Sequence, residues 1–416
     1  MSSMEDAEAP AMEGSEASGR HRLGVILLLA MGHLAGDFYA MLLTPLIQDF
    51  REAFSLSVTA VAVLVNVGSL SNSTLQPIFG HFLERFDQKS VFAVGLLIAT
   101  VVLSCIGLAP GPVWLGVLLA LGGLGVALFH PSGAVLTSRF AGPRRGLAMS
   151  VYTNGGAIGI ALAPLAVTLL MERATREMCW LFMPLGLATA TAVFGFVPRT
   201  AASSEPTRLP RWRSLVHPGA RSAWLVFLSV VLRSLAVVVI ASLVVIHSAE
   251  RGWSKAEGRL LLTAFLFSCA AGGVIGGYLS DYLDRRRLML AACFLAFPPL
   301  AAAWHVSHQG ALALLIAGGA VLSLSTPVNI VVAQELHPNH ASAMSGVMMG
   351  LAWSVSVVLL VPFGALADLT SATTALSASA LLPGLAGLCL LPLPDLPPTV
   401  RPKAAAESLA SAGENG

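Results

Sequence analysis

The chain has 416 residues, of which 56% are hydrophobic and only 11% are charged, and its mean hydropathy is +0.78. Soluble domains carry about 25% charged residues, so the composition excludes an ordinary soluble protein. The formal net charge is +2 and no basic block with interleaved aromatics occurs, which excludes a nucleic-acid binder and leaves the lipid bilayer and small solutes as expected partners.

Residues 1–22 are polar and acidic, do not suit a cleavable signal peptide, and are expected to form a disordered cytoplasmic N-terminus. Apolar stretches of about 20 residues, long enough to cross roughly 30 Å of hydrocarbon, then follow one another. Breaks at Gly, Pro and charged residues predict six helices, at 23–47, 57–80, 90–109, 111–138, 146–170 and 179–197. These form a predicted N-terminal bundle over residues 23–197.

Residues 198–221 contain three further prolines and five arginines after Pro198, which predicts a cytoplasmic linker. Six more helices are predicted at 222–247, 258–281, 287–306, 310–333, 342–367 and 373–393. They form a C-terminal bundle over residues 222–393, followed by a disordered cytoplasmic tail, 394–416. The predicted fold is an all-α, multi-pass cell-membrane protein with twelve transmembrane helices in two six-helix bundles.

The basic residues in the loops indicate on which side of the membrane the termini lie, because Lys and Arg are retained on the cytoplasmic side during insertion. With both termini inside, seventeen basic residues lie in inner loops and six in outer loops, and Arg233 lies inside a helix. The bias predicts cytoplasmic termini.

The sequence contains none of the enzyme, metal or cofactor motifs that we searched for. The five cysteines all lie in apolar spans without the close spacing of a metal or redox pair. No His-Glu-x-x-His motif, nucleotide-binding loop or paired carboxylates within one span occurs. The sequence therefore predicts that the protein is not an enzyme and has no catalytic residue, metal or cofactor. Transport is then expected to be driven by an ion gradient.

An internal repeat relates the two halves at an offset near 196 residues. Ala148-Met-Ser and Gly155 recur as Ala343-Met-Ser and Gly350, and Pro131 recurs as Pro327. Because several matches occur in one order, chance similarity between small residues is the weaker interpretation. Parallel repeats of this kind indicate two bundles that rock about a central site.

The segment Gly277-Tyr-Leu-Ser-Asp281, with Asp284 and Arg285 after it, resembles the signature loop of the major facilitator superfamily. A degenerate copy in the first half contains Gly80, Glu84 and Arg85. The resemblance implies a cytoplasmic gating motif made of these seven residues.

Several further segments resemble the fosmidomycin-resistance branch of that superfamily. They are Gly32-His-Leu-Ala-Gly-Asp-Phe, Leu75-Gln-Pro-Ile-Phe-Gly, Phe129-His-Pro, Gly155-Gly-Ala-Ile-Gly and Ala333-Gln-Glu-Leu-His-Pro. The resemblance implies a proton-coupled exporter of small compounds. Ser132 and Val135 stand where the branch usually has Glu and Arg, and Ala163 stands where Gly is usual.

Asp37 and Arg233 are the charged residues that lie well inside predicted spans. A charge at the bilayer centre costs about 2.5 to 3.5 kcal/mol even on permissive scales, so each needs a partner or a wet cavity. The repeat places them at near-equivalent positions on the first and seventh helices. We predict that they face each other, with His33 one turn before Asp37 as a proton relay, although a static packing pair would use the same residues.

Further polar residues are expected to line the cavity. Asn66, Ser69, Ser73 and Gln76 form one stripe at helical spacing, which would equally serve as interhelical glue. His130 could bind solute or respond to pH, or be a satisfied buried histidine. Asn154 and Asn329 complete the predicted lining, although Asn154 and its neighbouring glycines also suit close helix packing.

Together these features predict a monomeric secondary transporter that moves a small molecule by alternating access. A proton-coupled exporter, an antiporter for efflux of drugs or organic anions, is the first expectation. An importer or symporter of organic anions or sugars would share the topology. A membrane sensor or scaffold that does not transport could also keep this fold.

Overall fold

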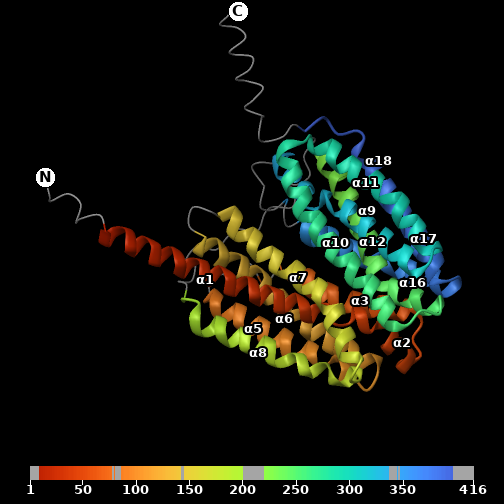
Figure 1. Ribbon diagram of the computed structural model, residues 1–416, viewed down its shortest axis with the longest axis horizontal. Coiled ribbons are helices and arrows are strands. Elements are labelled where there is room, and N and C mark those ends of the chain that lie inside the picture. Colours follow the sequence, from red (N-terminus) through yellow and green to blue (C-terminus); the bar gives the residue numbers. More distant parts are fainter. Residues whose placement is uncertain are drawn as a thin grey trace, which may run out of the picture. The chain divides into compact units, whose positions relative to one another are not determined.

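Figure 1 shows the computed structural model of the chain, which describes residues 9–76, 79, 86–141, 145–199, 220–336, 344 and 347–396. Every element in these ranges is a helix. The chain divides into two compact units, Met1–Leu209 and Pro210–Gly416. The division falls inside the segment predicted as a linker.

The first unit contains α1 (Ala9–Ala40), η1 (Thr44–Leu46), α2 (Ile47–Phe54), α3 (Val58–Ser73), α5 (Gln88–Ser104), η2 (Ile106–Leu108), α6 (Pro112–Phe140), α7 (Arg145–Met171), η3 (Arg176–Phe182) and α8 (Met183–Phe196). The second contains α9 (Ala220–Glu250), α10 (Lys255–Tyr282), α11 (Arg285–Ala302), η5 (Ala303–His305), α12 (His308–Ser323), α13 (Ser325–Leu336), η7 (Val347–Leu351), α15 (Ala352–Val358), α16 (Leu360–Leu369), α17 (Ala372–Ser379) and α18 (Leu381–Leu390).

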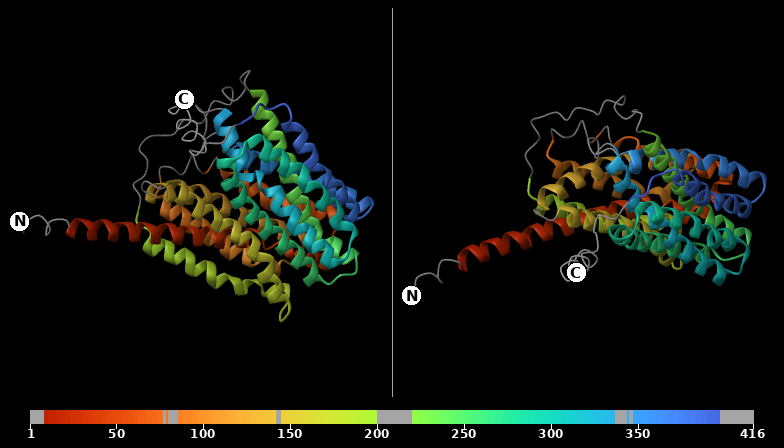
Figure 2. Two further views of the ribbon diagram at one scale, coloured as in Figure 1. Left: turned by 45° about the horizontal axis from the view of Figure 1, so that its top comes forward. Right: turned by 90° about the horizontal axis from the view of Figure 1, so that it is seen from above.

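Helix packing inside the two units follows one pattern. In the first unit α1 packs against α7, α5 against α6 and α8, and α3 against α6. In the second unit α9 packs against α15, α11 against α12 and α18, and α10 against α12. Figure 2 shows the helices of each unit from two further directions. The same neighbours recur in the same chain order, as the internal repeat predicts.

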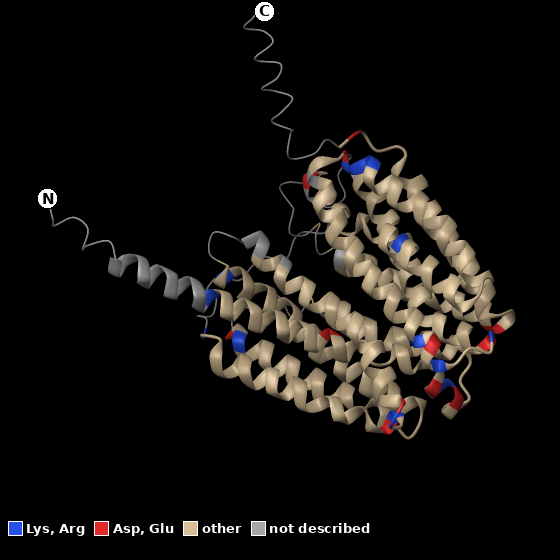
Figure 3. Ribbon diagram, viewed as in Figure 1, with Lys and Arg blue, Asp and Glu red and all other residues tan. Residues whose placement is uncertain are grey.

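Eleven helical stretches among the described residues are long and apolar enough to cross a membrane, and α3 is a shorter apolar helix. Figure 3 shows that most described acidic and basic residues lie near helix ends. This distribution suits membrane helices, because ionised side chains are costly in hydrocarbon.

Prolines explain three of the places where one predicted helix becomes two. α12 ends at Ser323, α15 at Val358 and α17 at Ser379. Each of these residues stands four positions before a proline, at 327, 362 and 383. A proline has no N–H for the carbonyl four residues earlier, and its ring clashes with that carbonyl.

The first helix begins earlier than expected. We predicted a disordered segment over 1–22, whereas α1 starts at Ala9. The added segment contains three Ala and two Glu, which have high helix propensity, and Pro10 stands where proline is tolerated in a helix.

Candidate functional site

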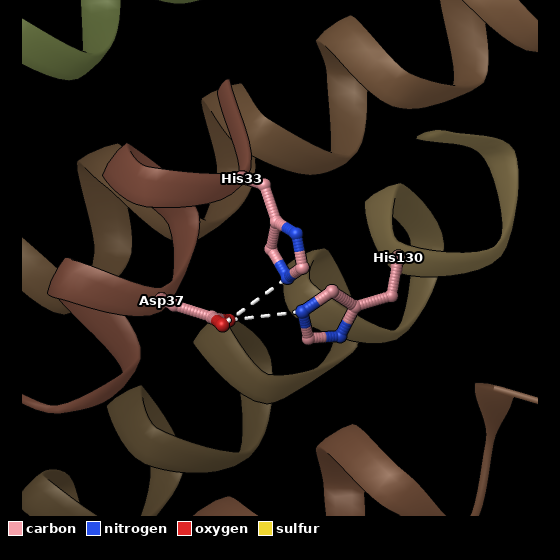
Figure 4. A group of neighbouring side chains, drawn as sticks. All are labelled: His33, Asp37 and His130. Carbon is pink, nitrogen blue, oxygen red and sulfur yellow. Dashed lines mark hydrogen bonds and ion pairs between the residues drawn. The ribbon is translucent and has the colours of Figure 1, made fainter. Parts of the chain in front are cut away.

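A buried polar cluster lies inside the first unit, between α1, α6 and α7 (Figure 4). His33 and Asp37 are four residues apart on α1, so their side chains lie on one face of the helix. His33 Nε2 lies 3.2 Å from Asp37 Oδ2. Both residues are only 8% exposed, so this carboxylate depends on protein partners rather than on solvent.

α6 supplies the second imidazole. His130 Nε2 lies 2.9 Å from Asp37 Oδ1, so one histidine contacts each carboxylate oxygen. The other ring nitrogen of His130 lies 3.0 Å from Gln76 Nε2, and Gln76 also donates to Asn72 Oδ1 at 2.7 Å. The amide of Gln76 therefore fixes the orientation of the His130 ring.

α7 closes the cluster with an aromatic ring and a glycine. The Tyr152 ring stacks on His33, with 4.3 Å between ring centroids, and the Tyr152 main-chain oxygen lies 2.8 Å from His33 Nδ1. A Cβ on Gly156 would clash with Asp37 Oδ2 and with His33 Nε2. Only glycine at position 156 lets α7 approach these two side chains as closely as it does.

The hydrogen bonds determine how many protons the cluster holds. His33 Nδ1 faces a carbonyl and must donate, whereas His130 Nδ1 faces the Gln76 NH2 group and accepts, which leaves its Nε2–H to donate to Asp37. The remaining contact, between His33 Nε2 and Asp37 Oδ2, needs one further proton. That proton lies on the imidazole or on the carboxyl, so the two groups share it.

Arg233 lies on α9 in the second unit and is 8% exposed. It donates to Thr326 Oγ1 at 3.0 Å and to Ser234 Oγ at 3.3 Å, and its buried Nε has no hydrogen-bond partner among the described residues. Both partners are neutral. The Asp37–Arg233 pair stays a prediction, and the ion pairs found for Asp37 are those with His33 and His130.

Among the other predicted lining residues, Gln76 bonds to His130 of the cluster. Asn66 and Ser73 are buried on α3, where the Asn66 amide donates to the Ala62 carbonyl, and Ser69 is half-buried. Asn154 is exposed on α7, and Asn329 is buried on α13, where its Oδ1 has no hydrogen-bond partner within the described part of the chain.

Of the predicted gating residues, Gly80, Glu84 and Arg85 lie outside the described residues. Gly277 and Asp281 belong to α10. Asp284 caps α11 by accepting from the Arg287 N–H, and it also accepts from the Leu396 N–H. The buried Arg285 forms an ion pair with Glu335 on α13, in which its Nη1 donates to both carboxylate oxygens.

Three features of the site were missed from the sequence. Tyr152 and Gly156 were not singled out as site residues, and His130 was not linked to Asp37 although both had been named. Asp37 and His130 are 93 positions apart in the sequence, so no local spacing relates them. Ser132, which replaces the expected acid after Phe129-His-Pro, bonds back to the Leu128 carbonyl of its own helix.

The comparisons with known proteins agree with this architecture. The family model for the Major Facilitator Superfamily matches twice, over residues 28–232 and 225–414. The fosmidomycin resistance protein of Escherichia coli (strain K12) is 26% identical over 92% of this chain and 95% of its own length. The MFS-type transporter YfnC of Bacillus subtilis is 27% identical over 88% of this chain and 92% of its own.

Solved structures resemble the chain in fold. A bacterial homologue of the human lysosomal transporter Spinster, inward-facing and occupied, has a TM-score of 0.73 at 16% identity and covers 89% of this chain and 96% of its own. The nucleoside transporter NupG has a TM-score of 0.73 at 12% identity and covers 88% and 98%. With the family model matching nearly the whole chain, the protein belongs to the major facilitator superfamily of membrane transporters, in its fosmidomycin-resistance-like branch.

Proposed function

We propose that this transporter exports a small solute by alternating access and that protons moving the other way drive it. In this proposal the chain crosses the membrane twelve times, with α3 as the second span and both termini in the cytoplasm. The observation that carries the proposal is the buried cluster of His33, Asp37 and His130, in which one imidazole nitrogen contacts each carboxylate oxygen, an arrangement that suits one proton shared between His33 and Asp37.

The physical reason is the cost of net charge inside the bilayer. With the shared proton present, the cluster of one acid and two imidazoles is neutral overall. Loss of that proton leaves a net charge of −1 in a site that is about nine-tenths buried at Asp37. Such a charge needs new solvent or a new counter-charge, so proton release is favoured in a conformation that supplies one. This links protonation to conformation, which is what coupled transport requires.

A buried residue of the second unit indicates which charge the solute carries. Arg233 carries a buried positive charge whose hydrogen-bond partners, Thr326 and Ser234, are neutral. This favours an acidic group on the solute, as in efflux of organic anions. The same charge supports the alternative of an organic-anion importer, so direction must be measured.

The test begins with growth of expressing and empty cells on fosmidomycin and on a panel of other toxic compounds. Any compound that expressing cells tolerate better is then followed in everted vesicles, with solute flux and proton flux recorded together. We expect wild-type vesicles to take up the compound only when the vesicle interior is more acidic than the medium. Uptake without the gradient, or flux in the opposite direction in cells, contradicts the proposal, and no flux for any compound favours a sensor or scaffold.

The variants Asp37→Asn and His33→Gln test whether the cluster couples proton flow to solute transport. Both should abolish proton flux and gradient-driven uptake while the protein is present in the membrane at normal level. Glu172→Gln removes an exposed acid from the same unit and is the matched control, with unchanged flux. If Asp37→Asn transports with unchanged pH dependence, the cluster does not couple protons. A fluorescent protein fused to the C-terminus, bright only in the cytoplasm, tests the topology.

A further inference from the structure

The polar cluster of the first unit has the atoms of a metal site. The ring nitrogens of His33 and His130 and a carboxylate oxygen of Asp37 lie within 4.8 Å of one another. The His–Asp separations are 3.2 Å and 2.9 Å. Ligands bound tetrahedrally at about 2.0 to 2.1 Å from zinc lie roughly 3.3 Å apart, so the two His–Asp distances already suit zinc. These two contacts use different oxygens of Asp37, and the ligand atoms lie up to 4.8 Å apart, so the widest pair must close by about 1.5 Å around the ion.

We propose that His33, Asp37 and His130 bind one divalent transition-metal ion of the Zn²⁺ class, with water at the remaining position. Two imidazoles and one carboxylate form a ligand set that zinc accepts when one coordination position stays open. Mg²⁺ and Ca²⁺ prefer oxygen ligands and should bind poorly. The proposal rests on the positions of the ligand atoms and not on the charge state of the cluster.

The surroundings orient both imidazoles as metal sites require. A metal-bound histidine usually donates its other ring N–H to a carbonyl, and His33 Nδ1 already lies 2.8 Å from the Tyr152 carbonyl oxygen. This contact directs the Nε2 lone pair of His33 at Asp37. His130 has Gln76 at its second nitrogen. When the His130 proton moves to Nδ1, half-turns of the Gln76 and Asn72 amides let the Gln76 oxygen accept hydrogen bonds from His130 Nδ1–H and from the Asn72 NH2 group.

Space for the ion comes from Gly156 on α7. A Cβ at this position would stand 2.5 Å from His33 Nε2 and closer still to Asp37 Oδ2. The side of the cluster where these two ligand atoms meet is therefore bounded by a glycine, and an added methyl group would occupy it. Gly156→Ala is thus a variant that keeps all three ligands and removes the room between them.

A bound ion would also have a mechanical effect. It would tie α1 to α6 through three strong bonds and would occupy the place of the shared proton. We therefore expect Zn²⁺ to inhibit transport. This inhibition rests on the function proposed above, whereas metal binding itself does not.

The test is isothermal titration calorimetry of the full chain in detergent, purified without a polyhistidine tag, with ZnCl2 as the probe. We expect one saturable site per chain that MgCl2 does not fill. His33→Gln, His130→Gln and Gly156→Ala should each weaken binding tenfold or more. His305→Gln removes an exposed histidine from the second unit and should leave this site unchanged. Equal affinity in wild type and all three cluster variants overturns the proposal.

X-ray absorption at the zinc edge gives a second measurement that needs no variant. We expect nitrogen and oxygen neighbours at about 2.0 to 2.1 Å, with the scattering pattern of two imidazoles. Sulfur at about 2.3 Å would place the ion on cysteine and refute the site. Zinc that binds as described but leaves flux unchanged contradicts the inhibition alone, whereas absent flux in metal-free protein contradicts the proposed function alone.

Discussion

Replacing Gly159 by alanine tests the contact on which the candidate site is built. Gly159 lies on α7, and a Cβ at this position would meet the main chain of Leu34 on α1, at 2.9 Å from its carbonyl carbon and 3.0 Å from its Cα. The carbonyl oxygen would be nearer still. These atoms belong to a helix backbone, so no side chain can turn aside to make room.

The expected magnitude follows from two opposing effects. Overpacking of a well-packed contact costs about 1 to 3 kcal/mol. Alanine in place of glycine inside a helix returns about 0.5 to 1 kcal/mol. The net loss of folding stability is therefore at most about 2.5 kcal/mol, and about 1.3 kcal/mol at the middle of both ranges. For a unit of about 200 residues the middle value corresponds to a fall in Tm of roughly 3 to 5 °C.

Thermal unfolding in detergent, followed by circular dichroism, measures this change. Gly24→Ala is the matched control, because a Cβ at Gly24 on α1 meets no atom within 4 Å. It should leave Tm unchanged or raise it slightly. Because Leu34 lies between His33 and Asp37 in sequence, Gly159→Ala should also weaken transport. A Tm for Gly159→Ala equal to or above that of Gly24→Ala would refute the close packing of α1 on α7.

Three further substitutions test other parts of the fold by the same unfolding measurement. Tyr39→Phe removes a buried hydroxyl that bonds two main-chain groups, and should cost about 1 to 3 kcal/mol, whereas Tyr278→Phe, at an exposed ring, should change little. Ser254→Ala breaks the capping box of α10 and should cost about 1 kcal/mol; an unchanged Tm would show that this cap is dispensable. Glu335→Gln removes the carboxylate that pairs with the buried Arg285 and should destabilise the protein. The loss of stability should be smaller in high salt, because Glu335 is half-exposed and salt screens its charge. A loss of stability that does not depend on salt would contradict an ion-pair origin.

Most helices could be predicted from apolar length alone, and the matching order of Ala148-Met-Ser and Ala343-Met-Ser indicated that the halves are related. Helix ends were less predictable. The breaks before Pro327, Pro362 and Pro383 follow from proline geometry, yet Pro131 and Pro164 lie inside unbroken helices. Whether a proline ends a helix depends on how its neighbours pack, and this information is absent from a hydropathy pattern.

The site was only partly predictable, for a similar reason. His33 and Asp37 are one helical turn apart, so their proximity follows from helix geometry. The approach of His130 depends on how α6 packs beside α1, and that of Gly156 on α7. Asp37 stood out because a buried charge needs a partner, and this reasoning is sound even where it does not name the partner. In this structure two histidines carry out that role.

The proline breaks have a consequence for how the two related units can deform. In the first unit α6 and α7 run continuously through their internal prolines. In the second unit the two lengths of chain that correspond to α6 and α7 are divided into shorter rods, at Leu324 and at Leu359. A divided rod bends at its joint under a smaller force than a continuous one. The two repeats therefore differ in stiffness along these two helices, which are continuous in the unit that holds the acid and its imidazoles and jointed in the other unit.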